Sequence, residues 1–166
     1  MSGQPIDDIQ WIHFSQLTAN DYNPNVVMNQ ELKLLELSIL QNGWLHPILI
    51  NKDLTVIDGF HRYSLTKISE KVQGMTGGMI PTIVLDLTEA ERMLLTIRIN
   101  RAKGSHIAFK MADIVKKLIT EYEYSPKEVA KQIGATKAEI DLLLQEDVFK
   151  KLDIQNHEYS KAWYPK

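Results

Sequence analysis

Strand-like and helical hydrophobic patterns alternate over the first 108 residues of the chain, and only helical patterns follow. Residues 47–51, 55–57 and 80–87 are short, mostly apolar runs rich in β-branched residues, which is typical of strands. Helical patterns lie between and after these runs. This order predicts a mixed α/β (α+β) domain with a small sheet over residues 1–108, and a helical module over residues 109–166.

Within the helical module, residues 125–145 have the pattern of a helix-turn-helix. Ser125 is expected to cap a first helix that begins with Pro126, and Gly134 permits the sharp turn before a second helix. If this pair of helices contacts DNA, the candidate residues are Lys131, Lys137 and Gln145. Four acidic residues in the second helix favour the alternative, in which the pair packs on the first domain or on a partner.

The composition limits the function classes. The chain has 166 residues, no cysteine, 44% hydrophobic residues and a formal net charge of −2. The lack of cysteine excludes disulfides and thiolate metal sites. No apolar run reaches the ~20 residues of a membrane helix, and no signal-peptide pattern is present, so we expect a cytoplasmic protein that does not contact membranes. With a net negative charge, DNA binding requires a local patch or an oligomer such as a homodimer.

The segment "VIDGFHRY" carries the first candidate site. A strand ends near Asp58, Gly59 allows a close backbone approach, and a helix begins whose free N–H groups would favour an anion. Arg62 in the first turn of this helix suits phosphate. His61 could donate a hydrogen bond to a ligand or transfer a proton, and Asp58 could hold Mg²⁺ or act as a base. The alternative is a structural turn in which Asp58 caps the helix and pairs with Arg62.

A second basic cluster, "RINRAKGSH", lies near the end of a later helix. Its alternative interpretation is a solvated helix end whose cations complement the helix dipole. Two phosphate-favouring segments in one small domain indicate a shared pocket for a nucleotide or another phosphorylated ligand. The candidate phosphate contacts from this cluster are Arg98, Asn100, Arg101, Lys103, Ser105 and His106.

Three separated motifs, "NDYNPN", "LKLLELSILQNGWLHPILI" and "VIDGFHRYSLTK", resemble the N-terminal domain of the ParB and sulfiredoxin-like superfamily. The pattern is most similar to ParB-like prophage regulators of the IbrB type, through residues 58–62, 100–106 and 156–163. The resemblance implies a ParB/sulfiredoxin fold that binds CTP, ATP or ADP with Mg²⁺. It places Gly59 and Arg62 at the phosphates, and Asn100 beside a metal that Asp58 would also contact.

Two departures from the ParB pattern leave the activity open. Partition proteins usually have Gly-Glu-Arg-Arg at the turn, and Ile99 here stands at the place of their metal-binding Glu. The turn is nearer to Asp-Gly-His-His-Arg of the ADP-dependent free-serine kinases that share this fold. In such an enzyme, Asp58 and His61 would be the catalytic candidates.

The sequence therefore supports two hypotheses. The first is a DNA-associated regulator of transcription or of prophage and other mobile-element genes, with a nucleotide-binding domain. The second is a nucleotide-dependent phosphotransferase or hydrolase. The helical module favours the regulator. Aromatic residues in the segment 156–164 are suited either to docking on the first domain or to binding another protein.

Overall fold

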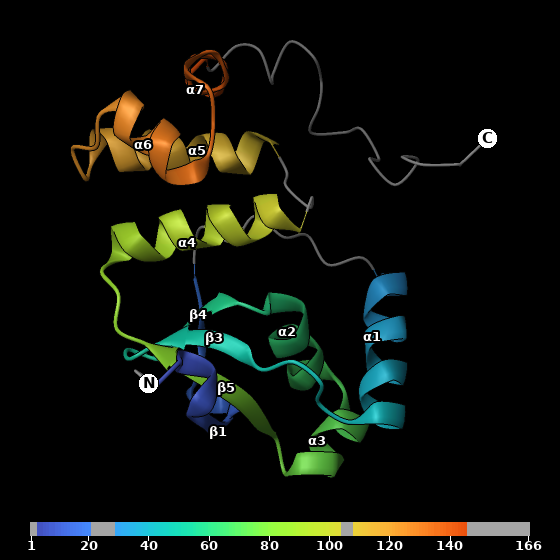
Figure 1. Cartoon of the computed structure of the whole chain (residues 1–166). Helices are drawn as coiled ribbons and strands as arrows, with labels where there is room; N and C mark the ends of the chain where they lie inside the picture. Colours follow the sequence, from blue (N-terminus) through green and yellow to red (C-terminus); the bar gives the residue numbers. More distant parts are fainter. Residues whose placement is uncertain (1–2, 21–28, 104–107, 146–166) are drawn as a thin grey trace. The chain divides into compact units, whose positions relative to one another are not determined.

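The computed structural model describes residues 3–20, 29–103 and 108–145. The chain divides into two compact units, residues 1–106 and 107–166. The described residues form five strands and seven α-helices, which confirms the mixed α/β class (Figure 1). None of the described helices is long and apolar enough to span a membrane.

The first unit contains all five strands, and the first four α-helices lie between or after them. The strands are β1 (Ile9–His13), β2 (Thr18–Ala19), β3 (Ile48–Asn51), β4 (Thr55–Asp58) and β5 (Met79–Leu85). The α-helices are α1 (Asn29–Asn42), α2 (Phe60–Ile68), α3 (Glu70–Thr76) and α4 (Glu89–Ala102). Two short 3-10 helices are η1 (Pro5–Asp7) and η2 (Phe14–Gln16).

The five strands form one mixed sheet in the order β1-β5-β3-β4-β2. The β1–β5 and β3–β4 pairs are antiparallel, whereas β3–β5 and β2–β4 are parallel. The hairpin from β3 to β4 therefore lies inside the sheet, and β4 ends where α2 begins. This connection places the Asp58–Arg62 turn at the C-terminal end of the inner strand β4, whose central residues are buried.

Two groups of buried side chains hold the first unit together. One group packs Tyr63 of α2 against the sheet, where Ile48, Ile50, Val56 and Ile80 are fully or almost fully buried. The other joins α1, α2 and α3 through Ile39, Leu65 and Val72. Figure 1 shows α4 above the sheet and α3 below it. Both ends of α2 are thus fixed, the first by the sheet and the second by two helices.

The sequence patterns located most of these elements, with three differences. The strand expected over 80–87 is β5, which ends at Leu85, and its central residues are buried on both faces. The two-residue strand β2 and the helix α3 were not expected; Ser69 ends α2 and then caps α3 through the Val72 amide. The helical pattern of residues 59–71 predicts that Phe60, Leu65 and Ile68 face inward; Leu65 is 3% exposed, but Ile68, the last residue of α2, is 67% exposed.

The second unit is helical in its described part. It contains α5 (Ala108–Thr120), α6 (Pro126–Ile133) and α7 (Lys137–Leu143), which pack on one another. Ser125 caps α6 and Thr136 caps α7, each through the backbone amide three residues later. Gly134 between them has a φ of 66°, as a tight turn requires.

Candidate functional site

The candidate site is built around the turn that joins β4 to α2. Gly59 is the N-cap residue of α2, and no side chain caps this helix. Of the structural alternative, the Asp58 cap is therefore not seen, whereas the pairing of Asp58 with Arg62 is seen at 3.6 Å. Within the described residues, the first amide groups of α2 therefore lack the capping side chain that usually satisfies such groups, which leaves them suited to an anion.

Gly59 is required by the fold at this position. Its φ is 94°, and a Cβ atom would lie 2.4 Å from Cγ2 of Ile48. The backbone therefore approaches β3 too closely for any side chain. Packing against Ile48 explains this glycine without a ligand, although the same absence of a side chain leaves the helix terminus open.

Asp58 and Lys103 meet at the site although they are far apart in sequence. The Lys103 Nζ atom lies 2.9 Å from both carboxylate oxygens of Asp58. Asp58 is largely buried, with 15% of its side chain exposed, whereas Lys103 is 48% exposed. Lys103 follows directly after α4, so the end of this helix brings part of the second basic cluster to the turn.

Arg62 faces the backbone of the preceding loop. Its Nη1 atom donates to the carbonyl oxygens of His46 and Pro47 at 2.8 and 2.6 Å, and its Nη2 atom lies 3.6 Å from Asp58. Burial lowers the pKa of the Arg62 guanidinium, and the charge of Asp58 opposes this shift. Arg62 thus ties the loop before β3 to the turn, a role that no side-chain pattern in the sequence indicates.

The side chains that meet at the turn carry one negative and two positive charges. Asp58 contributes one carboxylate, and Arg62 and Lys103 contribute one cation each, which leaves one net positive charge. The positive end of the α2 dipole adds to this charge. If an anion replaced Asp58 as the partner of Lys103, the positive charge of Lys103 and the positive end of the α2 dipole would balance the charge of the anion.

His61, in the first turn of α2, has a buried Nε2 atom for which the structure shows no hydrogen-bond partner. A buried polar atom of this kind costs free energy unless water or a ligand satisfies it. Its location beside the uncapped helix terminus makes it a candidate contact for a ligand at the turn.

The other phosphate candidates on α4 differ in their environments. Asn100 is 5% exposed and its amide donates to the Thr96 carbonyl within the helix at 2.9 Å. Arg98 is exposed and Arg101 is half-buried. Ser105 and His106 lie outside the described residues. Of the second basic cluster, Lys103 contacts the turn, through Asp58.

The residues proposed for Mg²⁺ do not form a metal cluster by themselves. The described residues contain no group of three or more His, Cys, Asp or Glu side chains able to hold a metal. Asp58 is engaged by Lys103, and the Asn100 amide donates within its own helix. A metal at this site would need most of its oxygen ligands from water or a nucleotide.

The candidate DNA contacts lie in the second unit. Lys131 on α6, Lys137 at the start of α7 and Gln145 beyond its end are all exposed. The buried residues of these two helices are instead apolar: Val129 and Ile133 on α6 and Ile140 on α7.

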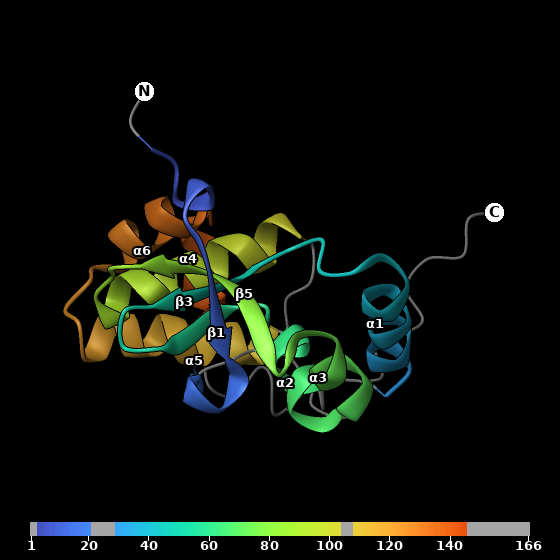
Figure 2. The ribbon, with the colours of Figure 1, turned by 90° about the horizontal axis from the view of Figure 1, so that it is seen from below.

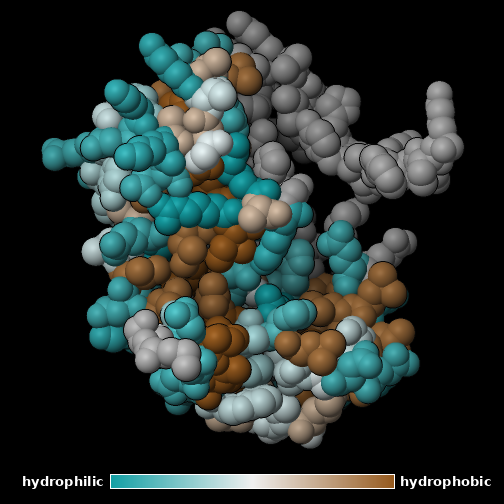
Figure 3. All heavy atoms as spheres, in the orientation of Figure 1, coloured by the Kyte–Doolittle hydropathy of each residue, from teal (hydrophilic) through white to brown (hydrophobic). Residues whose placement is uncertain are grey.

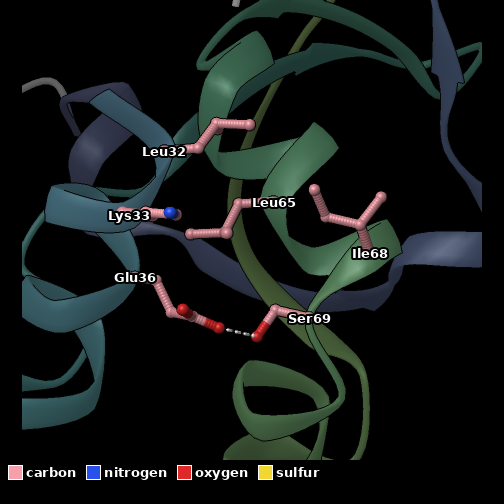
Figure 4. A pocket seen from close by; sticks show the side chains of 6 residues that line it. All are labelled: Leu32, Lys33, Glu36, Leu65, Ile68 and Ser69. Atoms are coloured by element: carbon pink, nitrogen blue, oxygen red, sulfur yellow. Dashed lines mark hydrogen bonds between the residues drawn. The ribbon is translucent and has the colours of Figure 1, made fainter. Parts of the chain in front are cut away.

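A separate pocket of about 270 Å³ lies between α1 and the C-terminal end of α2 (Figure 4). Its lining is mixed: Leu65 and Ile68 form an apolar side, and Glu36 accepts a 2.5 Å hydrogen bond from the Ser69 hydroxyl. Leu65 is six residues after Gly59, about 9 Å along the helix axis. The pocket is therefore distinct from the turn.

Comparison with solved structures identifies the class of the fold. A Pnob8-like ParB-N domain matches with a TM-score of 0.59 and 13% identity, over 90% of this chain and 74% of that one. The C-terminally truncated chromosome-partitioning protein ParB from Caulobacter crescentus, solved in complex with the centromeric parS site, matches with a TM-score of 0.52 and 19% identity, over 87% and 77%. The fold is that of a ParB N-terminal domain.

Sequence relatives agree with this class. The uncharacterized protein YbdM of Escherichia coli K12 is 34% identical over 164 residues, 96% of this chain and 78% of that protein. A probable chromosome-partitioning protein ParB of Rickettsia bellii is 27% identical over 146 residues, 86% of this chain and 48% of that protein. No model of a known protein family matches the chain. The chain belongs to the same family as YbdM and has the ParB-like N-terminal domain fold; it spans about half the length of the Rickettsia ParB proteins that it matches.

Proposed function

We propose that the chain is a ParB-like, DNA-associated regulatory protein, acting on transcription or on prophage and other mobile-element genes, whose first domain binds a nucleotide at the Gly59 turn. The observation that carries this proposal is the uncapped start of α2 beside two cations, Arg62 and Lys103, that come from different parts of the sequence.

In this proposal, the nucleotide phosphates are bound by the first amide groups of α2 and by Lys103. Lys103 is half exposed and can move from Asp58 to a phosphate with little reorganisation of the fold. Arg62 keeps its Nη1 atom on the two carbonyl oxygens and contributes positive charge through Nη2. His61 supplies a further hydrogen bond through its Nε2 atom, which lacks a partner in the structure.

Mg²⁺ is proposed to bind together with the nucleotide. Release of Lys103 would free both oxygens of Asp58, and the Asn100 amide oxygen is the second protein candidate. Two oxygen donors with phosphate oxygens and waters make up the octahedral set that Mg²⁺ prefers.

The second unit is proposed to provide the DNA contact. Lys131, Lys137 and Gln145 are exposed on or next to the α6–α7 pair. The ParB of Caulobacter crescentus was solved with its parS site, which supports a test of duplex DNA for this chain. Because the net charge is −2, we expect binding to depend strongly on salt and on these few cations.

Nucleotide binding is tested by thermal unfolding of the full chain with CTP, ATP, ADP, GTP or phosphate, each with and without Mg²⁺. A ligand at 100 times its Kd stabilises the folded state by about 2.7 kcal/mol. The Lys103→Met variant should lose this shift. Lys52→Met is the matched control, because Lys52 pairs with the exposed Asp86. A shift that persists in Lys103→Met would remove Lys103 from the site, and no shift with any ligand would contradict nucleotide binding.

DNA binding is tested by fluorescence anisotropy with duplex DNA at low and at physiological salt. Lys137→Glu should weaken binding, whereas Lys71→Glu makes the same charge change on α3 and should have a smaller effect. Equal losses in both variants would indicate a general charge effect. No loss in Lys137→Glu would favour the interpretation in which α6 and α7 form a packing pair.

A nucleotide-dependent phosphotransferase or hydrolase is the second candidate, and the location of His61 and Asp58 at the turn favours it. Asp58 or His61 would accept the proton of an attacking hydroxyl or water. The assay measures phosphate release from CTP, ATP and ADP, and phosphate transfer to free serine. Activity that disappears in both Asp58→Asn and His61→Gln, with nucleotide binding retained, would support the enzyme.

Two further predictions concern the same regulatory role. An IbrB-type function and a protein-binding role for the segment 156–164 remain predictions from the sequence, and the segment lies outside the described residues. Pull-down with the full chain and with a chain ending at residue 155 would test the second.

A further inference from the structure

The outer edge of β1 is one of the two open ends of the sheet, and the two-residue strand β2 forms the other. β1 pairs with β5 on one side, and no other strand of the described residues pairs with it on the other side. Figure 2 shows β1 at the near side of the molecule, next to β5. Edge strands expose unpaired backbone N–H and C=O groups that can pair with another strand.

The register shows which backbone groups face this open edge. Trp11 lies opposite Pro81, which has no N–H group, so this pair cannot exchange two backbone hydrogen bonds. The Phe14 amide donates to the Gly78 carbonyl, and the Gln10 carbonyl accepts from the Thr82 hydroxyl. Even-numbered residues of this segment therefore face β5. The N–H and C=O groups of Ile9, Trp11 and His13 face outward.

The side chains on this edge are apolar and exposed. Ile9 is 43% exposed and Trp11 49%, and both project from the face opposite to Ile12, which packs on the core. Ile6 in η1, just before the strand, is 52% exposed. Figure 3 shows hydrophobic side chains gathered on the face where β1 and β5 lie. The strand also lacks the lysine, proline or bulge that commonly protects an edge.

We propose that β1 pairs antiparallel with β1 of a second copy of this chain, about a two-fold axis at Trp11. In this register, Trp11 of one copy lies opposite Trp11 of the other, and Ile9 lies opposite His13. All three outward-facing residues then form hydrogen-bonded pairs, and the two sheets become one sheet of ten strands.

The side chains are compatible with this register. The two Trp11 side chains lie on the same face, where aromatic cross-strand pairs are favourable. No residue of β1 is acidic, and Asp8, just before the strand, lies six residues from its symmetry mate along the paired strands. That spacing is about 20 Å, beyond the screening length of ~8 Å at physiological salt. Self-pairing therefore brings no like charges together. Because β1 has no Asp, Glu, Lys or Arg side chain that would attract an acidic or a basic peptide, a second copy is the favoured partner.

The first test measures the mass of the full chain by light scattering across a concentration series. The chain has a mass of 19.1 kDa, and we expect the mass to rise toward twice this value with concentration. Trp11→Lys and Ile9→Lys should remain monomeric. Leu34→Lys is the matched control, because Leu34 is 69% exposed on α1, and it should dimerise like the wild type. A monomeric wild type up to about 0.5 mM would overturn the proposal.

Hydrogen exchange separates edge pairing from any other dimer. At low concentration, the amides of Gln10 and Ile12 should be protected by β5, whereas those of Ile9, Trp11 and His13 should exchange fast. At high concentration, the three outward amides should become protected, and this gain should be absent in Trp11→Lys. A dimer without this alternating gain would place the interface elsewhere and contradict the proposal. Urea unfolding checks that Trp11→Lys is folded.

Discussion

Lys103, directly after α4, donates to both carboxylate oxygens of Asp58 at the end of β4, at 2.9 Å each, across 45 residues of sequence. The pair joins the two phosphate-favouring segments that the sequence indicated, residues 56–63 and 98–106. In this pair, Lys103 neutralises the carboxylate of Asp58. Asp58 therefore controls how much positive charge the turn offers to an anion.

Replacing Asp58 by Asn should change nucleotide binding in opposite directions with and without Mg²⁺. Without the metal, loss of the carboxylate frees Lys103 and should raise the affinity for a nucleotide by about 2- to 10-fold, since a local charge is removed in a partly solvated site. With Mg²⁺, the variant should lose any gain that the metal gives the wild type. Isothermal titration in EDTA and in Mg²⁺ measures both effects. An equal Mg²⁺ gain in the two proteins would exclude Asp58 as a metal ligand.

Replacing Gly59 by Ala should strongly destabilise the first unit. The new Cβ would lie 2.4 Å from Ile48 Cγ2 in a backbone with φ of 94°, so strain and overpacking add. We expect a loss of about 2–5 kcal/mol in the free energy of unfolding. Gly134→Ala is the control, because φ is 66° there but nothing lies within 4 Å of the new Cβ. It should cost only about 1 kcal/mol in urea unfolding. Similar losses at both sites would show that the contact with Ile48 is unimportant.

Replacing Arg62 by Met should reduce stability even without a ligand. The change removes the two hydrogen bonds to the His46 and Pro47 carbonyls, each from a charged donor. We expect a loss of about 2–3 kcal/mol, measured by urea unfolding. Arg62→Lys keeps the charge but not the planar fork, and it should lose less. If Arg62→Met is as stable as the wild type, the hydrogen bonds of Arg62 to the two carbonyls do not stabilise the fold, and a role in ligand binding alone would be favoured.

The capping carboxylate of α6 should give the second unit a pH-dependent stability. The hydroxyl and the backbone amide of Ser125 both donate to Glu128, and these hydrogen bonds lower the pKa of Glu128 below 4.5. A lowered folded-state pKa contributes stability above the unfolded pKa, and this contribution disappears as the pH falls through the folded value. Glu128→Ala should therefore have a lower Tm than the wild type at neutral pH, by an amount that shrinks as the pH falls below 4.5. A difference independent of pH would mean that the carboxylate charge is not involved.

Helix caps, turns and buried strands could be predicted from single segments of the sequence. The capping box Thr88–Glu91, the Ser125 cap, the glycine turn at Gly134 and the buried strand β5 each involve neighbouring residues. Short-range hydrogen bonding and hydrophobic pattern therefore suffice to predict them. The ParB-like class was also predicted from the sequence, because three separate motifs occur along the chain in the order that the ParB-like pattern has.

Tertiary structure decided the contacts that define the candidate site. The structural alternative placed Asp58 as the cap of α2 and as the partner of Arg62; Asp58 does lie near Arg62, but it does not cap the helix and its carboxylate binds Lys103, because the end of α4 returns to the end of β4. Arg62 was expected to face a ligand but holds the carbonyl oxygens of His46 and Pro47, which any residue would offer there. The edge of β1 is open because β5 pairs with one side of it and no other strand of the described residues pairs with the opposite side. Such long-range partners depend on how the elements pack, and no local pattern encodes which side chain arrives from a distant segment.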